Sequence, residues 1–119
     1  MNLSKFAPAL VLYAKDIART VAFYETLGIV FKDEKHGDGP LHAAAEFGPF
    51  VLEVYPKSRT PTGPRTTRER LVFHIDDIEG MAALLKFAKH PVAGPTHSVH
   101  GMALLTRDPD GRDILLLAR

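Results

Sequence analysis

The chain of 119 residues contains no cysteine. Disulfides, thiolate nucleophiles and cysteine-based zinc sites are therefore excluded. Its longest apolar runs, such as residues 114–118, are too short to span a bilayer. The first ten residues lack the apolar stretch and the cleavage site of a signal peptide. We therefore expect a cytoplasmic protein with no membrane partner.

An excess of charge of either sign is also lacking, because the formal net charge is only +1. A nearly neutral chain has no general attraction to nucleic acid. Basic residues gather at 57–68, but no aromatic residue is interleaved with them to read bases. With 45% apolar residues, the chain is long enough to bury one core without disulfides. We expect a single globular domain, 1–119, with no nucleic-acid partner.

The chain follows the same plan twice. Residues 13–17 (YAKDI) are echoed by residues 74–78 (HIDDI), and their aspartates Asp16 and Asp77 lie 77 − 16 = 61 positions apart. A strand-like run precedes each aspartate and an amphipathic helix follows it. Asp16 suits the N-cap of the first helix, and Gly28 suits its end. Asp76 and Glu79 resemble a capping box for the second helix. The residues expected on the apolar helix faces are Ile17, Val21, Tyr24 and Leu27, then Ile78, Met81, Leu84, Leu85 and Phe87.

Three strand-like segments follow each helix. They cover 29–34, 41–47 and 50–55 in the first half, and 92–98, 102–106 and 112–118 in the second. The Asp-Gly step at 110–111 and the Gly-Pro step at 48–49 predict the tight turns between strands. The pattern predicts an α+β fold of two tandem βαβββ modules, with module one at 1–55, a linker at 56–69 and module two at 70–119.

Strand parity sorts these residues onto two faces, because successive side chains alternate across a sheet. One face is uniformly apolar and should carry the helices: Leu10, Leu12, Leu52, Val54, Leu71, Phe73, Ile75, Ile114 and Leu116. The opposite face mixes apolar and titratable groups: Ala9, Val11, Tyr13, Val51, Glu53, Tyr55, Arg70, Val72, His74, Asp113, Leu115 and Leu117. A mixed surface of this kind suits a ligand, so we expect the function there.

Three features together resemble the vicinal oxygen chelate superfamily, which includes glyoxalases, bleomycin-resistance proteins and extradiol dioxygenases. They are the paired modules, the stretch from Asp16 through Phe23-Tyr24 to Leu27-Gly28, and the Asp-Pro-Asp-Gly turn at 108–111. The resemblance covers nearly the whole chain. It implies curved mixed sheets with helices on the outer face, and a homodimer.

The resemblance also implies where a metal would be bound in the superfamily's enzymes. The corresponding positions are Ala9, Glu53, Arg70 and Leu115, with 70 − 9 = 61 and 115 − 53 = 62. Only Glu53 offers a metal ligand, because alanine and leucine have no donor atoms and arginine is a permanent cation. A catalytic ion normally takes three protein ligands. We therefore expect a degenerate metal site and no cofactor.

The leading hypothesis is a small-molecule-binding protein of the bleomycin-resistance type, which sequesters a drug or a metabolite. Its expected ligand contacts are Tyr13, Glu53, Tyr55, Arg70 and His74. Arg70 offers a planar fork of donors to an anionic group, or it pairs with Glu53 as an internal salt bridge. His74 is either a ligand contact or a structural residue.

The alternative is a lyase, isomerase or dioxygenase of the same superfamily, with Glu53 or His74 as the candidate catalytic base. It would be metal-free or would use a relocated ion held by Glu53, His74 and either His42 or His100. The six histidines show no close helical spacing that would favour one such set. A third possibility is a vestigial cleft on a protein-binding module, marked by an exposed apolar patch elsewhere.

Overall fold

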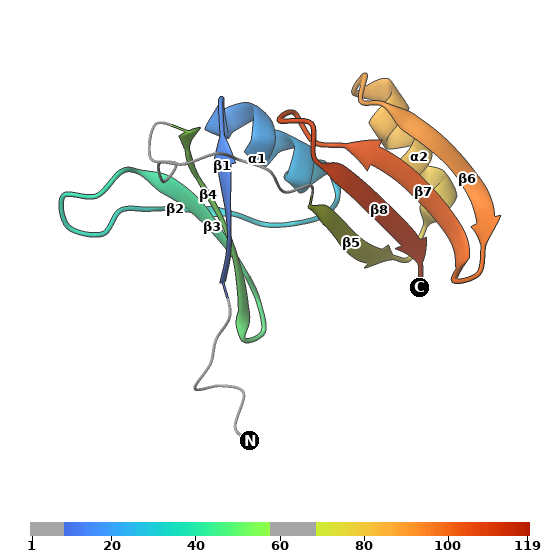
Figure 1. Ribbon diagram of the computed structural model, residues 1–119, viewed down its shortest axis with the longest axis horizontal. Coiled ribbons are helices and arrows are strands. Elements are labelled where there is room, and N and C mark those ends of the chain that lie inside the picture. The colour runs from blue at the N-terminus through green and yellow to red at the C-terminus, as the bar shows by residue number, and fades with distance from the viewer. Residues whose placement is uncertain (1–8, 58–68) are drawn as a thin grey trace. The chain divides into compact units, whose positions relative to one another are not determined.

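The computed structural model describes residues 9–57 and 69–119, and the chain divides into two compact units, Met1–Gly63 and Pro64–Arg119 (Figure 1). The first unit contains β1 (Ala9–Ala14), α1 (Ile17–Thr26), β2 (Lys32–Glu34), β3 (His42–Phe47) and β4 (Phe50–Pro56). The second contains β5 (Arg70–Ile75), α2 (Ile78–Phe87), β6 (Val92–Ser98), β7 (Gly101–Arg107) and β8 (Asp113–Ala118). The described helices include none that is long and apolar enough to cross a membrane.

Both units have the same topology. The sheet orders are β1-β4-β3-β2 and β5-β8-β7-β6, and in each the first strand runs parallel to the last while the other pairs are antiparallel. The registers also match, because Val11 lies opposite Glu53 in one sheet and Val72 opposite Leu115 in the other. This confirms the α+β fold of two tandem βαβββ modules.

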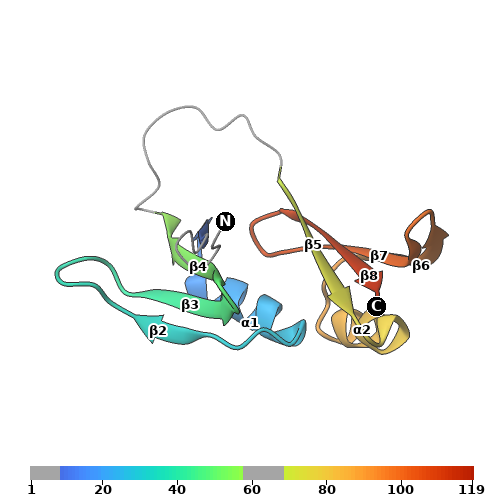
Figure 2. The same cartoon turned by 90° about the horizontal axis from the view of Figure 1, so that it is seen from below.

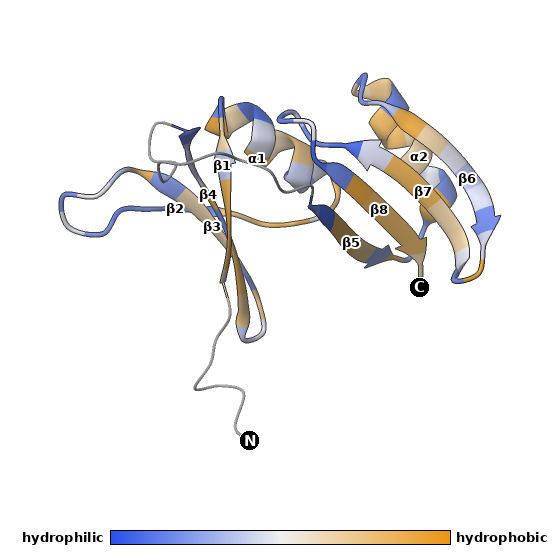
Figure 3. Ribbon diagram, in the orientation of Figure 1, coloured by the Kyte–Doolittle hydropathy of each residue, from blue (hydrophilic) through white to orange (hydrophobic). Residues whose placement is uncertain are grey.

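Each helix packs on one face of its own sheet (Figure 2). On the helix-bearing face of the first sheet, Leu12, Leu52 and Val54 are buried as strand parity predicted. In the second unit Leu71, Ile114 and Leu116 are buried in the same way. Figure 3 shows β8, inside the sheet, as mostly hydrophobic and the edge strand β6 as paler. The helices therefore leave the opposite face of each sheet available for function.

The turns and the first helix end are as predicted. Gly28 follows Leu27, the C-cap of α1, with φ +99°, and Gly111 takes φ +88° in the β7–β8 turn. Positive φ suits glycine because it has no Cβ. The strands differ from the expected segments mainly at β2, which is shorter, and at β4, which extends to Pro56. Of the expected linker, residues 58–68 lie outside the described part of the chain.

The predicted cap of the second helix was wrong by one residue. Asp77, not Asp76, is the N-cap of α2, and its Oδ1 accepts a hydrogen bond of 2.9 Å from the backbone N–H of Gly80. Asp76 is exposed and lies 3.5 Å from the Arg119 guanidinium. The 61-residue repeat gives the physical reason, since it aligns Asp77 with Asp16, whose carboxylate caps α1 through Arg19 N–H.

This difference predicts unequal effects of two neighbouring substitutions. Asp77→Ala should lower the free energy of unfolding by about 1 kcal/mol, because it leaves a helix N–H without its acceptor. Asp76→Ala removes only an exposed ion pair and should change it by less than about 0.5 kcal/mol. Urea denaturation of the two variants measures the difference. Equal losses would contradict the cap assignment.

The apolar face of α2 was also predicted too broadly. Ile78, Ala82 and Leu85 are buried at the expected spacing, whereas Leu84 is 54% exposed and Phe87 is 89% exposed. Helical periodicity does not show how wide the buried apolar face of a helix is. The prediction therefore placed Leu84 and Phe87 in the core.

Candidate functional site

The open face of the first sheet, opposite α1, brings five polar side chains together. Glu34 lies opposite His42 in the β2–β3 register, and Ala44, two residues further along β3, lies opposite Glu53. Tyr55 follows Glu53 by two residues and lies opposite Tyr13. Residues two apart on a strand share a face, so Tyr13, Glu34, His42, Glu53 and Tyr55 all belong to this open face.

His42 is the buried centre of this group. The residue is 2% exposed, and its Nδ1 lies 3.1 Å from the carbonyl oxygen of Pro40. Because a carbonyl only accepts, Nδ1 carries the proton and donates it there. In the neutral ring this leaves the lone pair on Nε2. Within the described residues, Nε2 is a buried side-chain atom that has no hydrogen-bond partner.

Two carboxylates flank that nitrogen. The Nε2 atom of His42 lies 3.3 Å from Oε2 of Glu53 and 3.4 Å from Oε2 of Glu34. A second imidazole, that of His36 in the β2–β3 connection, lies 3.4 Å from the same Glu34 oxygen. One ligand atom from each of these four residues falls within 4.8 Å of all the others. We call Glu34, His36, His42 and Glu53 the His–Glu cluster.

Aromatic rings border the cluster. The Tyr55 ring stacks on His42 with centroids 4.1 Å apart and an interplanar angle of 10°, and Tyr13 lies 6.3 Å from Tyr55. Burial raises the pKa of the Tyr55 phenol, and the carboxylates of Glu53 and Glu34 raise it further. The phenol therefore stays protonated at neutral pH, beside a concentration of negative charge.

The predicted contacts divide between the two units. Tyr13, Glu53 and Tyr55 come together in the first, as expected. Arg70 and His74 lie on one face of β5 in the second unit, opposite Asp113 and Leu117 of β8, and both are exposed. The pairing of Arg70 with Glu53 stays a prediction, and the described contact of the Glu53 carboxylate is with His42.

Sequence reasoning did not select Glu34 or His36, and it named His42 only for an alternative metal set. The histidines it added to that set, His74 and His100, belong to the second unit and are not in the cluster. The sequence does contain a pattern that points to the cluster: Glu34-x-His36 at the end of one strand, and His42 at the start of the next. In an antiparallel hairpin such residues face each other. The signal depended on β2 ending at Glu34, and strand ends are poorly predicted from sequence.

The four positions that the resemblance assigned to a metal, Ala9, Glu53, Arg70 and Leu115, stay a prediction. Ala9 and Arg70 begin β1 and β5, and Leu115 occupies in β8 the register position that Glu53 occupies in β4. Their side chains comprise one carboxylate, one guanidinium and two hydrocarbons, which do not fit a divalent ion.

Comparison with known proteins agrees with this architecture. The family model of the glyoxalase/bleomycin resistance protein/dioxygenase superfamily matches residues 7–115. The chain belongs to this superfamily. No curated protein sequence matches it significantly.

Solved structures share the fold of this superfamily member. An antibiotic-binding protein, TnmS3 from Streptomyces sp. CB03234, is 24% identical with a TM-score of 0.73, and the match covers 92% of each chain. A virulence protein from Salmonella typhimurium is 26% identical with a TM-score of 0.67, covering 93% of this chain and 94% of that one. Lactoylglutathione lyase from Agrobacterium tumefaciens is 19% identical with a TM-score of 0.64, covering 92% and 90%.

Proposed function

We propose that this superfamily member binds a small, polar, aromatic molecule on the open sheet faces, as a sequestration protein of the bleomycin-resistance type. The observation that carries the proposal is the half-buried pair of Tyr13 and Tyr55 beside the Glu53 carboxylate. Aromatic faces provide stacking area, and a carboxylate fixes the orientation of a ligand that carries donors. The likeness to an antibiotic-binding protein supports a small-molecule ligand.

The degenerate superfamily metal site is part of this proposal. One donor among Ala9, Glu53, Arg70 and Leu115 cannot hold an ion that polarises a substrate at those positions. In the proposed function Arg70 instead offers its guanidinium to an anionic group of the ligand, and His74 offers a ring nitrogen four residues along the same strand.

A homodimer is also proposed. The exposed side chains of Leu84 and Phe87 lie one turn apart on α2 and form an apolar area that a partner subunit could cover. The mass measured by light scattering during gel filtration tests it. The cytoplasmic location stays a prediction.

Ligand binding can be followed with the protein's own fluorescence. The chain has three tyrosines and no tryptophan, and two of those tyrosines, Tyr13 and Tyr55, lie on the proposed surface. A panel of planar aromatic compounds with charged or hydrogen-bonding groups should contain members that quench this emission with saturation. Tyr55→Ala should lower the affinity for such a compound by about tenfold, because stacking area is lost. Arg70→Ala should lower it by about tenfold as well, because a charged hydrogen bond is lost.

Matched variants serve as controls for this experiment. Tyr55→Phe keeps the ring and should retain most of the affinity. Arg19→Ala removes an exposed arginine of α1 and should leave the affinity unchanged. Unchanged affinity in both Tyr55→Ala and Arg70→Ala would contradict the proposed surface. A loss in Tyr55→Ala alone would confine the ligand to the first unit.

The second candidate function is a lyase, isomerase or dioxygenase of the same superfamily. The 3.3 Å contact between His42 Nε2 and Glu53 Oε2 favours it, because a carboxylate beside an imidazole is a common arrangement for proton transfer.

A further inference from the structure

We propose that the His–Glu cluster is a site for a divalent transition-metal ion, built entirely from the first unit. It shares only Glu53 with the positions that the superfamily's metal enzymes use, and it needs no residue of the second unit. The inference goes beyond the proposed function, because it concerns metal alone and not the organic ligand.

The first argument is the state of His42. Metal-binding histidines usually donate the second ring N–H to a backbone carbonyl or a carboxylate, which fixes the tautomer and aims the other nitrogen at the ion. His42 shows this arrangement, with Nδ1 on the Pro40 carbonyl and Nε2 directed between two carboxylates. A buried nitrogen without a hydrogen bond is costly unless something else satisfies it. A cation between these groups would do so.

The second argument is the spacing of the ligand atoms. Charge-assisted hydrogen bonds between nitrogen and oxygen are about 2.7–2.9 Å long. The three nitrogen–oxygen distances in the cluster are 3.3, 3.4 and 3.4 Å, which is longer. Two ligand atoms that share a tetrahedral ion at about 2.1 Å lie about 3.4 Å apart. These three separations are close to the edge of a coordination tetrahedron, and the other separations among the four ligand atoms are no longer than 4.8 Å.

The third argument is charge and ligand type. Two carboxylates and two neutral imidazoles carry a net charge of −2, which a divalent ion neutralises. Mixed imidazole and carboxylate sets suit zinc, iron, nickel and manganese more than calcium or magnesium, which prefer oxygen alone. We take zinc as the probe.

The four ligands should contribute unequally. His42 is buried and Glu53 has a side chain that is only 17% exposed, so both are held in place before metal binds. The side chain of His36 is 71% exposed and must lose rotamer freedom when it coordinates. We expect His42→Phe, which keeps a ring against Tyr55, and Glu53→Gln each to weaken zinc binding by about 100-fold or more. His36→Ala should weaken it by about tenfold.

The experiment is calorimetric titration of the untagged, metal-free chain with zinc, paired with absorption spectra after cobalt(II) addition. We expect one ion per chain, and cobalt bands whose intensity reports four-coordinate nitrogen and oxygen ligands. His97→Ala, which removes an exposed histidine of the second unit, should bind like the wild type. Far-ultraviolet circular dichroism shows that each variant is folded.

Two results would overturn the site. One is wild-type affinity for zinc weaker than about 0.1 mM. The other is equal affinity in wild type, His42→Phe and Glu53→Gln, which would place the ion elsewhere. In either case the cluster is a hydrogen-bonded imidazole between two carboxylates. The fluorescence titration with aromatic compounds is carried out on metal-free protein. A failure of the zinc site therefore does not affect the test of the proposed organic ligand.

Discussion

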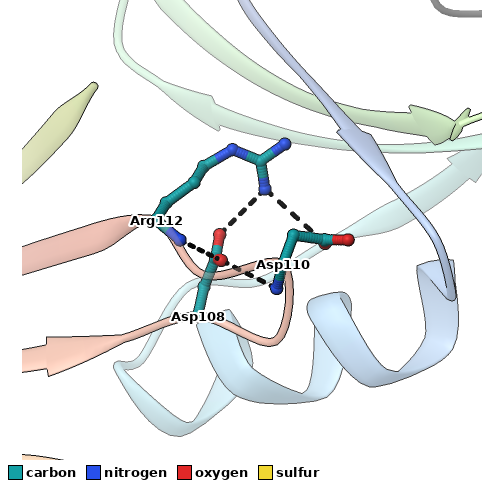
Figure 4. Close-up of polar contacts among 3 residues, drawn as sticks. All are labelled: Asp108, Asp110 and Arg112. Carbon is teal, nitrogen blue, oxygen red and sulfur yellow. Dashed lines mark hydrogen bonds and ion pairs between the residues drawn. The ribbon is translucent and has the colours of Figure 1, made fainter. Parts of the chain in front are cut away.

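Replacing Asp108 by alanine is expected to lower the free energy of unfolding by about 3 kcal/mol, although the residue lies in a turn. Its side chain is fully buried between β7 and β8 (Figure 4). Oδ1 accepts hydrogen bonds of 3.0 Å from the backbone N–H groups of Asp110 and Arg112, and Oδ2 accepts one of 2.9 Å from the Arg112 guanidinium. Urea denaturation measures the loss.

The size of this effect follows from what the substitution leaves behind. The Arg112 side chain is only 8% exposed, so it would lose its main partner in a poorly hydrated place. Removing one member of a buried ion pair typically costs 3–5 kcal/mol, roughly, because the other charge stays buried. Asp110, with Oδ2 3.6 Å from the guanidinium, compensates in part, so we expect the lower end of that range.

Asp113→Ala is the matched control for Asp108→Ala. Asp113 also pairs with an arginine, Arg107, at 3.2 Å, but the two side chains are 38% and 64% exposed. Exposed pairs contribute little, so the loss should stay below about 1 kcal/mol. A similar loss in both variants would mean that the buried turn contributes no more than a surface pair.

The turn shows how far sequence could predict this fold. The Asp-Gly step predicted the reversal correctly, because Gly111 takes a positive φ. The role of Asp108 as the centre of the turn was not predicted, since it depends on burial of the Arg112 guanidinium. Local turn chemistry is encoded in a few neighbouring residues, whereas burial depends on the packing of the whole unit.

The candidate site was predictable to a similar extent. Alternation along β1 and β4 was enough to place Tyr13, Glu53 and Tyr55 on one face, and their register confirms it. To predict that Glu34 and His36 belong to the cluster, one would have to know the exact end of β2 and the path of the β2–β3 connection. Neither follows from periodicity, because a three-residue strand is too short to show any.

Phe23→Ala should have the second large effect, a loss of about 3–4 kcal/mol in the free energy of unfolding. Phe23 is fully buried in α1 and meets Tyr24 edge to face, with ring centroids 5.1 Å apart. The substitution removes a whole aromatic ring from a fully buried position, and close-packed surroundings relax only partly to fill the space. Urea denaturation followed by circular dichroism gives the loss.

Phe87→Ala is the control, because this phenylalanine is 89% exposed on α2 and its removal should cost less than about 0.5 kcal/mol in the monomer. Phe23 belongs to α1, which contributes no residue to the His–Glu cluster, so the folded fraction of Phe23→Ala should still bind zinc with wild-type affinity. A loss of zinc affinity beyond the loss of folded protein would show that the α1 layer sets the positions of the ligands. A loss of stability below about 1 kcal/mol would contradict the assignment of Phe23 to the core.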